Sequence, residues 1–177
     1  NTAFQARNLA RASMIFDKMI QDDDCSVILC LAGSLFSAGL KKVIFDMVSH
    51  NMVDAIVSTG AIIVDQDFFE ALGFKHYQGS PQTSDDELYK HGIDRIYDTF
   101  INEDNLRDCD MTIKKIADDL PPAAYSSRQF IHIMGEMLNK TNKGKGSVVR
   151  EAFEKDVPIF VPAFSDSSAG FGLVFHQ

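Results

Sequence analysis

The chain lacks the features that mark membrane and secreted proteins. Its 177 residues contain no run of about 18 uninterrupted apolar residues, which argues against a membrane-spanning helix. The first residues, NTAFQARNLARAS, contain no apolar core of a secretory signal. The sequence also has no internal repeat and no low-complexity tract. We therefore expect one globular domain, residues 1–177, with no membrane partner.

Basic residues are too few for a typical nucleic-acid-binding protein. Lys and Arg number 17 against 25 Asp and Glu, so the formal net charge is -8. Proteins that bind nucleic acid usually carry a basic face, and we expect no nucleic-acid partner here. An acidic surface suits a protein that handles cations, although it also serves solubility alone.

Cysteine and histidine are present but not in patterns that bind metals. The cysteines are Cys25, Cys30 and Cys109, with no CxxC pair, and the five histidines lack metal-ligand spacing. We therefore predict no metal site. Because the cysteines are odd in number and two adjoin apolar runs, we expect buried thiols in a reducing, cytoplasmic compartment.

Three short apolar segments have the composition of strands in a parallel sheet. Ser26–Ala32 (SVILCLA) reads as a strand buried on both faces, and Asp54–Thr59 and Val157–Ala163 read as two more. Each of the first two strands is followed by a Gly-containing turn and a helical pattern. This rhythm predicts an α/β fold: a Rossmann-like, doubly wound, mainly parallel sheet with helices on both faces.

Helices are predicted for the start and the middle of the chain. Residues 6–20 place apolar side chains at helical spacing. In the middle, Ser84 with Glu87 and Ser126 with Gln129 form capping-box patterns, which mark helix N-termini. The sequence therefore predicts a helical middle segment.

Small and hydroxyl-bearing residues follow all three predicted strands. They are AGS at 32–34, STGA at 58–61 and SDSSAG at 165–170. Ligands of open parallel sheets bind outside the carboxyl ends of the strands, where helix N-termini can bind phosphate and a carboxylate can bind a ribose. The pattern favours a shared nucleotide site. The same residues are also ordinary turn and cap residues, and the sequence has neither G-x-G-x-x-G nor a P-loop.

Several long stretches resemble deoxyhypusine synthase and its bacterial homologues. They cover nearly all of the chain, in order: TAFQARNLARA, LAGSLFSAGLKKVIFDMVSHNMVDAIVSTGA, DQDFFEALG, HGIDRIYDTFINEDN, SSRQFIHIMGEML and VPIFVPAFSDSSAGFGLVFH. The resemblance implies an NAD-dependent enzyme with a Rossmann-like core, usually a homotetramer with active sites between paired subunits. This family oxidises spermidine at its secondary amine and passes the resulting butylimine, through an enzyme lysine, to an acceptor amine. The acceptor is a lysine of the hypusine-containing translation factor or, in some bacterial relatives, a free diamine.

The resemblance also implies where the ligands bind. A polyamine-binding acidic pair falls on Asp65 and Gln66, and Phe171 stands where the eukaryotic pattern has an aspartate. Because hydrogen bonds to charged groups are worth about 1.5–3 kcal/mol, the loss of two anions should change how spermidine is held. The implied NAD contacts are Gly33, Ser34, Leu35, Phe36, Ser37, Thr59, Gly60, Ala61 and Asp166.

The catalytic lysine of the family falls beyond Gln177, and the chain stops after a strand-like segment, GLVFH at 172–176. We therefore expect these residues to be part of a longer protein and to be inactive alone. The alternative is a non-catalytic paralogue that binds and stabilises an active partner chain.

Overall fold

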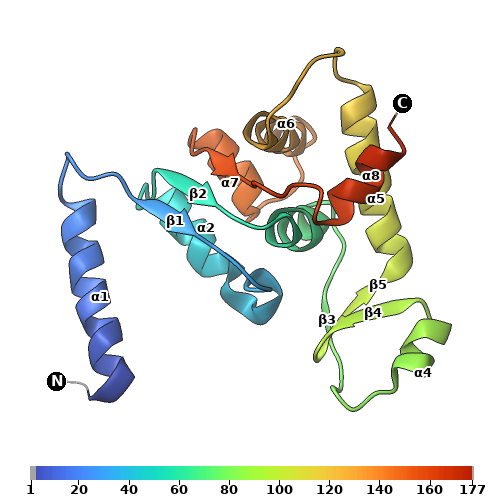
Figure 1. Ribbon diagram of the computed structural model, residues 1–177, viewed down its shortest axis with the longest axis horizontal. Helices are drawn as coiled ribbons and strands as arrows, with labels where there is room; N and C mark the ends of the chain where they lie inside the picture. Colours follow the sequence, from blue (N-terminus) through green and yellow to red (C-terminus); the bar gives the residue numbers. More distant parts are fainter. Residues whose placement is uncertain (1–2, 177) are drawn as a thin grey trace.

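A three-stranded parallel sheet forms the centre of the computed structural model, which describes residues 3–176 (Figure 1). Its strands are β1 (Ile28–Cys30), β2 (Ala55–Val57) and β6 (Ile159–Phe160), in the order β1-β2-β6. The predicted parallel sheet is confirmed, with strands shorter than their apolar segments. All three carboxyl ends therefore lie along one edge of the sheet.

The middle strand carries the core. Ile56 stands opposite Leu29 on one side and Ile159 on the other, and it is fully buried. Asp54, just before β2, accepts a hydrogen bond from the backbone N–H of Val27 at 2.6 Å. This contact joins the amino ends of β1 and β2, so register is specified by both packing and a polar contact.

Helices follow the first two strands, as predicted, and both begin with π-helical turns. After β1 come η1 (Phe36–Leu40) and α2 (Lys41–Ser49); after β2 come η2 (Ala61–Phe68) and α3 (Phe69–Ala71). Such turns are rare in proteins as a whole, and those that occur are often at functional sites. The η2 segment is apolar on most of its faces and is almost wholly buried, which makes it the central helix of the core.

The middle of the chain contains the predicted helices α4 (Asp85–Lys90), α5 (Glu103–Asp118) and α6 (Ser127–Lys140). The capping box before α6 forms: the N–H of Ser126 donates to Gln129 Oε1 at 2.8 Å, and the N–H of Gln129 donates to Ser126 Oγ at 3.3 Å. At α4 the N-cap is the expected serine, but its side chain forms no capping hydrogen bond.

A small antiparallel sheet in the middle was not expected from the sequence. Its strands are β3 (Tyr77–Gln78), β4 (Ile93–Ile96) and β5 (Thr99–Asn102), in the order β3-β5-β4. The turn between β4 and β5 contains Tyr97, whose φ is 55°. Because two-residue hairpin turns usually carry Gly or Asn, this turn gave no recognisable hairpin signal.

The last residues form α7 (Val148–Glu154), β6 and α8 (Ser168–Val174). The expectation that 172–176 is strand-like is wrong, because most of it belongs to α8, which lies against α5 (Figure 1). An ideal Cβ at Gly172 would stand 2.4 Å from the backbone oxygen of Asp110. Glycine therefore permits a close helix–helix contact that the local sequence pattern does not reveal.

Strand β1 is less buried than predicted. The side chain of Ile28 is 62% exposed and Cys30 is exposed, so a strand buried on both faces is wrong for this segment. The reason is that β1 is an edge strand and that the preceding helix α1 (Phe4–Ile20) places no buried residue over it (Figure 1). Of the other two cysteines, Cys109 is buried and Cys25 is partly buried. No helix within residues 3–176 combines the length and apolar content needed to cross a bilayer.

Candidate functional site

A cleft of about 730 Å³ opens beyond the carboxyl ends of β2 and β6. Five segments border it: η2, β4, α5, the loop after β6, and α8. The residues that line it are Ala61, Asp65, Asp94, Glu103, Leu106, Arg107, Asp110, Ser165, Asp166, Ser167 and Phe171. Four residues predicted to bind ligands are therefore brought together at one site: Ala61, Asp65, Asp166 and Phe171.

The loop after β6 reaches the cleft because it packs closely on the end of β2. An ideal Cβ at Gly60 would lie 2.7 Å from Ser167 Oγ and 3.1 Å from the backbone oxygen of Phe164. Ser167 Oγ also donates to that oxygen at 2.8 Å, which shapes the turn. Gly60 is thus required by packing between two strand ends, and the turn leaves Asp166 exposed at the cleft.

Carboxylates dominate the lining of the cleft. Asp65 comes from η2, Asp94 from β4, Glu103 and Asp110 from α5, and Asp166 from the loop after β6. The lining has one basic side chain, Arg107, which is ion-paired with Glu103 at 3.0 Å and with Asp104 at 3.4 Å. A cleft with this lining has a negative potential, which attracts cations.

The contribution of α5 to the cleft was not predicted from the sequence. Glu103, Leu106, Arg107 and Asp110 follow the spacing i, i+3, i+4, i+7, which places them on one helix face. That spacing was visible in the sequence. Three of the four side chains are charged, so the face resembles a solvated one, and only the packing of α5 beside the strand ends turns it toward a cleft.

Burial changes the acidity of two neighbouring residues on α5. It raises the pKa of Asp110 to about 6. Burial also raises the pKa of the Cys109 thiol, and the nearby charges of Asp65 and Asp110 raise it further. Cys109 therefore stays a protonated, buried thiol and is not a nucleophile. Because the charge of Asp65 contributes to the raised pKa of Cys109, Asp65 lies near this part of α5.

The carboxylates do not converge on a single point. Among the residues that the structure describes, no group of three or more His, Cys, Asp or Glu side chains could hold a metal ion. Of these acids, Glu103 and Asp110 stand two turns apart on one face of α5. Such spacing suits a ligand whose positive charges are separated.

Gln66, which was predicted to contact the substrate, makes a different contact. It is 2% exposed, and its Oε1 accepts hydrogen bonds from the backbone N–H groups of Phe36 at 3.1 Å and Ser37 at 3.0 Å. Gln66 is not among the residues that line the cleft. It binds the first turn of η1, where the sequence analysis had placed N–H groups for a phosphate.

The predicted cofactor residues occupy the ends of all three strands, with differing exposure. Asp166 and Ala61 line the cleft, whereas the side chain of Phe36 is buried in the core. Gly33 has a φ of 78° and open space where a side chain would stand. Thr59 is exposed and Ser34, Leu35 and Ser37 are partly buried. Their contacts with a cofactor stay a prediction.

Two buried hydroxyl groups beside these residues have no hydrogen-bond partner among the described residues. They are Ser37 Oγ in η1 and Ser58 Oγ directly after β2. Buried polar atoms usually find a protein, water or ligand partner. Both lie at the strand ends where the nucleotide was predicted, so the local chemistry fits a polar ligand there.

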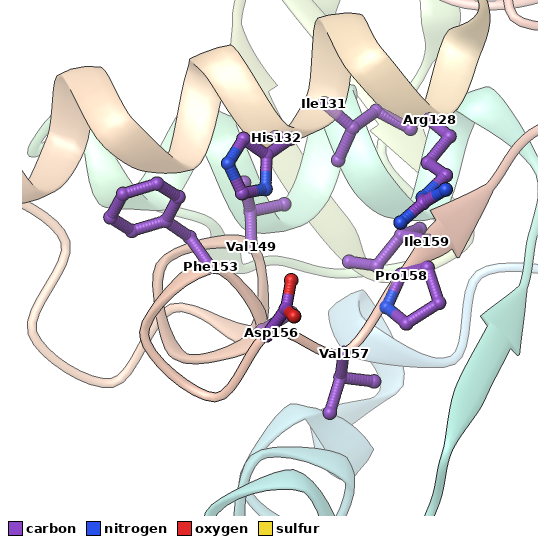
Figure 2. Close-up of a pocket in the computed structure, with 10 residues that line it drawn as sticks. Arg128, Ile131, His132, Val149, Phe153, Asp156, Val157, Pro158 and Ile159 are labelled. Carbon is purple, nitrogen blue, oxygen red and sulfur yellow. The ribbon is translucent and has the colours of Figure 1, made fainter.

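A second, much smaller pocket lies at the opposite end of β6. Figure 2 shows Arg128 and His132 of α6 facing the turn of Asp156, Val157 and Pro158 that leads into the strand. Its volume of about 20 Å³ has room for about one water molecule. The pocket is a packing gap at the amino end of the strand and is too small for a substrate.

Comparison with known proteins identifies the family. A family model described as deoxyhypusine synthase matches residues 1–177. Deoxyhypusine synthase-like proteins of Chlorobaculum parvum and Chlorobaculum tepidum are each 65% identical over 175 residues, which is 99% of this chain and 50% of theirs. The protein of the same description from Elusimicrobium minutum is 59% identical over 178 residues, covering 100% of this chain and 48% of its own.

A solved structure shares the fold. The crystal structure of an Entamoeba histolytica protein described as a deoxyhypusine synthase matches with a TM-score of 0.72 and 22% identity, over 98% of this chain and 59% of that one. The α/β fold, the match of the family model over the whole chain and the high identity to these relatives agree. The chain belongs to the deoxyhypusine synthase family. It spans about half the length of the curated relatives it matches.

Proposed function

We propose that this chain supplies the nucleotide- and amine-binding half of an NAD-dependent transferase that moves an aminobutyl group from spermidine to an acceptor amine. The observation that carries the proposal is the acidic cleft at the carboxyl ends of parallel strands, in a chain of this family. A cleft of this charge suits a polyamine, and its place at the strand ends suits a nucleotide.

The residues at the strand ends would hold NAD. Asp166 is placed to accept hydrogen bonds from a ribose or an amide, and the open turn at Gly33 lets a ligand approach the backbone. The partnerless hydroxyls of Ser37 and Ser58 would gain a partner there. Because the N–H groups of Phe36 and Ser37 already bind Gln66, a phosphate would have to use other donors. When bound, NAD would take the hydride from the carbon beside the secondary amine of spermidine.

The polyamine would lie along the carboxylates of the cleft. Asp65 is placed to bind an ammonium group by a charge-assisted hydrogen bond. The ring of Phe171, which is 67% exposed in the same cleft, offers a cation–π face worth about 0.5–2 kcal/mol. An apolar residue at this position favours a small diamine as acceptor at least as much as a lysine of a translation factor.

The family's lysine nucleophile corresponds to no position within residues 1–177, so the transfer would need residues supplied by another part of the protein or by another subunit. Helix α1 has exposed apolar side chains, which supports assembly of this chain with further copies. Leu9 is 70% exposed and Met14 is 66% exposed. We propose that this face packs on another copy in a cytoplasmic homotetramer.

The second candidate is a non-catalytic subunit that stabilises an active partner chain. Two observations favour it: Phe171 lacks a carboxylate, and Gln66 binds the backbone of η1 rather than the cleft. A subunit of this kind would still bind NAD or an active partner but would transfer nothing itself.

The decisive experiment incubates the protein, expressed from its complete reading frame, with NAD, spermidine and either putrescine or a purified translation-factor acceptor. We expect homospermidine from putrescine, detected by chromatography of the amines. Asp166→Ala should weaken NAD binding by more than about tenfold, or about 1.4 kcal/mol, measured by calorimetry. Failure to transfer to either acceptor, with NAD binding intact, would replace the first proposal by the second.

A further inference from the structure

We propose that Asp110 is a substrate-binding residue of the cleft, whose carboxylate binds one ammonium group of an elongated polyamine beside Phe171. This inference rests on the proposed function, because it assigns a role within the same amine-binding cleft. It adds a residue of α5 that the sequence analysis did not connect with ligand binding.

The packing of α8 on α5 places Asp110 at this point. The two helices approach closely where Gly172 meets Asp110, since an ideal Cβ at Gly172 would lie 2.4 Å from the Asp110 backbone oxygen. Phe171, the residue next to this contact, is exposed into the same cleft. An aromatic ring and a carboxylate thus border one part of the cleft, and together they can hold an alkylammonium group by its charge and its methylene groups.

The spacing along α5 matches a ligand with separated charges. Glu103 and Asp110 share a helix face and stand two turns apart, about 10 Å at 1.5 Å per residue. That span is comparable to an extended triamine. A divalent metal ion would need converging carboxylates, which the described residues do not form. Arg107 lies between these two acids in the sequence. It forms ion pairs with Glu103 and Asp104, which neutralise its positive charge.

The protonation of Asp110 should make ligand binding depend on pH. Burial raises the pKa of this carboxyl to about 6, and a bound ammonium group would lower it again. Binding should therefore release a proton near pH 6, and affinity should fall as the pH drops through this range. The charged groups that share the cleft with it are Asp65 of η2, Asp94 of β4, Glu103 and Arg107 of α5, and Asp166 of the loop after β6.

The test is calorimetric titration of spermidine into the protein expressed from its complete reading frame, between pH 5 and pH 8. We compare wild type with Asp110→Asn and with the control Asp108→Asn, which changes an exposed acid on the same helix outside the cleft. We expect Asp110→Asn to lose about tenfold or more in affinity at pH 8. Wild type and Asp108→Asn should both lose affinity below pH 6, whereas Asp110→Asn should vary much less with pH.

A second variant separates charge from folding. Phe171→Asp, combined with Asp110→Asn, places a carboxylate on the neighbouring helix and should restore part of the lost affinity. Circular dichroism checks that each variant is folded. If Asp110→Asn binds spermidine as tightly as wild type at pH 8, this inference is overturned while the proposed function stands. If wild type itself binds no spermidine, the proposed function fails and this inference fails with it.

Discussion

The hydroxyl of Ser147 donates a hydrogen bond to the carboxylate of Asp67 at 2.7 Å, across 80 positions of the sequence. Asp67 is fully buried in η2 and also accepts from the backbone N–H groups of Val148 at 2.9 Å and Val149 at 2.8 Å. One carboxylate therefore accepts hydrogen bonds from the backbone N–H groups in the first turn of α7, which have no acceptor within the helix. Since η2 also carries Asp65, this contact fixes the helix that forms one wall of the cleft.

Replacing Asp67 with Ala should destabilise the protein strongly. Three buried donors would lose their acceptor, and an unsatisfied buried group costs about 1–3 kcal/mol. We expect the free energy of unfolding in urea to fall by about 3 kcal/mol. The matched control is Asp119→Ala, at an exposed position at the end of α5, which should change it by less than about 0.5 kcal/mol. Equal effects of the two substitutions would show that the buried contact contributes little.

Replacing Gln66 with Ala should also cost stability, because the N–H groups of Phe36 and Ser37 would lose their buried acceptor. We expect a loss of about 2 kcal/mol in urea unfolding, against a negligible change for the control Gln82→Ala at an exposed position. If Gln66 instead binds substrate, Gln66→Glu should tighten spermidine binding in calorimetry. The structure leads us to expect no such gain.

The ionisation of Asp110 should contribute a loss of stability as the pH rises. The pKa of this carboxyl is about 6 in the folded chain against an ordinary value of 3.8, so between these values the folded state holds the proton that the unfolded state has released. The contribution of Asp110 to stability should therefore fall from about pH 4 to about pH 6 and then level off. Asp110→Asn should remove this loss and raise stability at pH 7 by about 1 kcal/mol, because solvent screens this partly exposed carboxyl, with no gain at pH 4.

The measurement is chemical denaturation of wild type and Asp110→Asn at pH 4 and pH 7. Asp108→Asn serves again as the control and should follow wild type at both values. A stabilised Asp110→Asn that has lost spermidine affinity would mean that this position sacrifices stability for binding. No difference in stability at pH 7 would show that the carboxylate is well solvated and that its ionisation does not destabilise the folded protein.

Adding a methyl group at Gly172 should disturb the cleft by separating α8 from α5. In Gly172→Ala the new Cβ would meet the backbone oxygen of Asp110 at 2.4 Å and Ile113 Cβ at 3.1 Å. We expect a loss of about 1–3 kcal/mol in stability and weaker spermidine binding, because Phe171 would move with the helix. Val174→Ala, on an exposed face of the same helix, is the control and should leave both quantities near wild type.

Much of the central fold could be predicted from local patterns. The apolar segments around Ile28, Ile56 and Ile159 predicted three parallel strands, because β-branched runs between turns and helices suit a covered parallel sheet. The capping box of Ser126 and Gln129 predicted the start of α6 for an equally local reason. The resemblance predicted the ligand residues Asp65, Asp166 and Phe171, which the structure brings to one cleft.

Other features depended on contacts between distant segments. A strand-like apolar pattern became α8, because Gly172 lets that segment pack on α5. The side chain of Gln66 turned to the backbone of η1, since a buried amide needs a partner and the N–H groups of Phe36 and Ser37 were within reach. The charged face of α5 became a wall of the cleft only because the helix lies beside the strand ends. The sequence by itself thus determined the three parallel strands of the central sheet and the small and hydroxyl-bearing residues that follow them, through local composition and turn chemistry. Only the tertiary structure decided which polar side chains face the cleft and which bind the backbone, because long-range packing decides which groups are buried together.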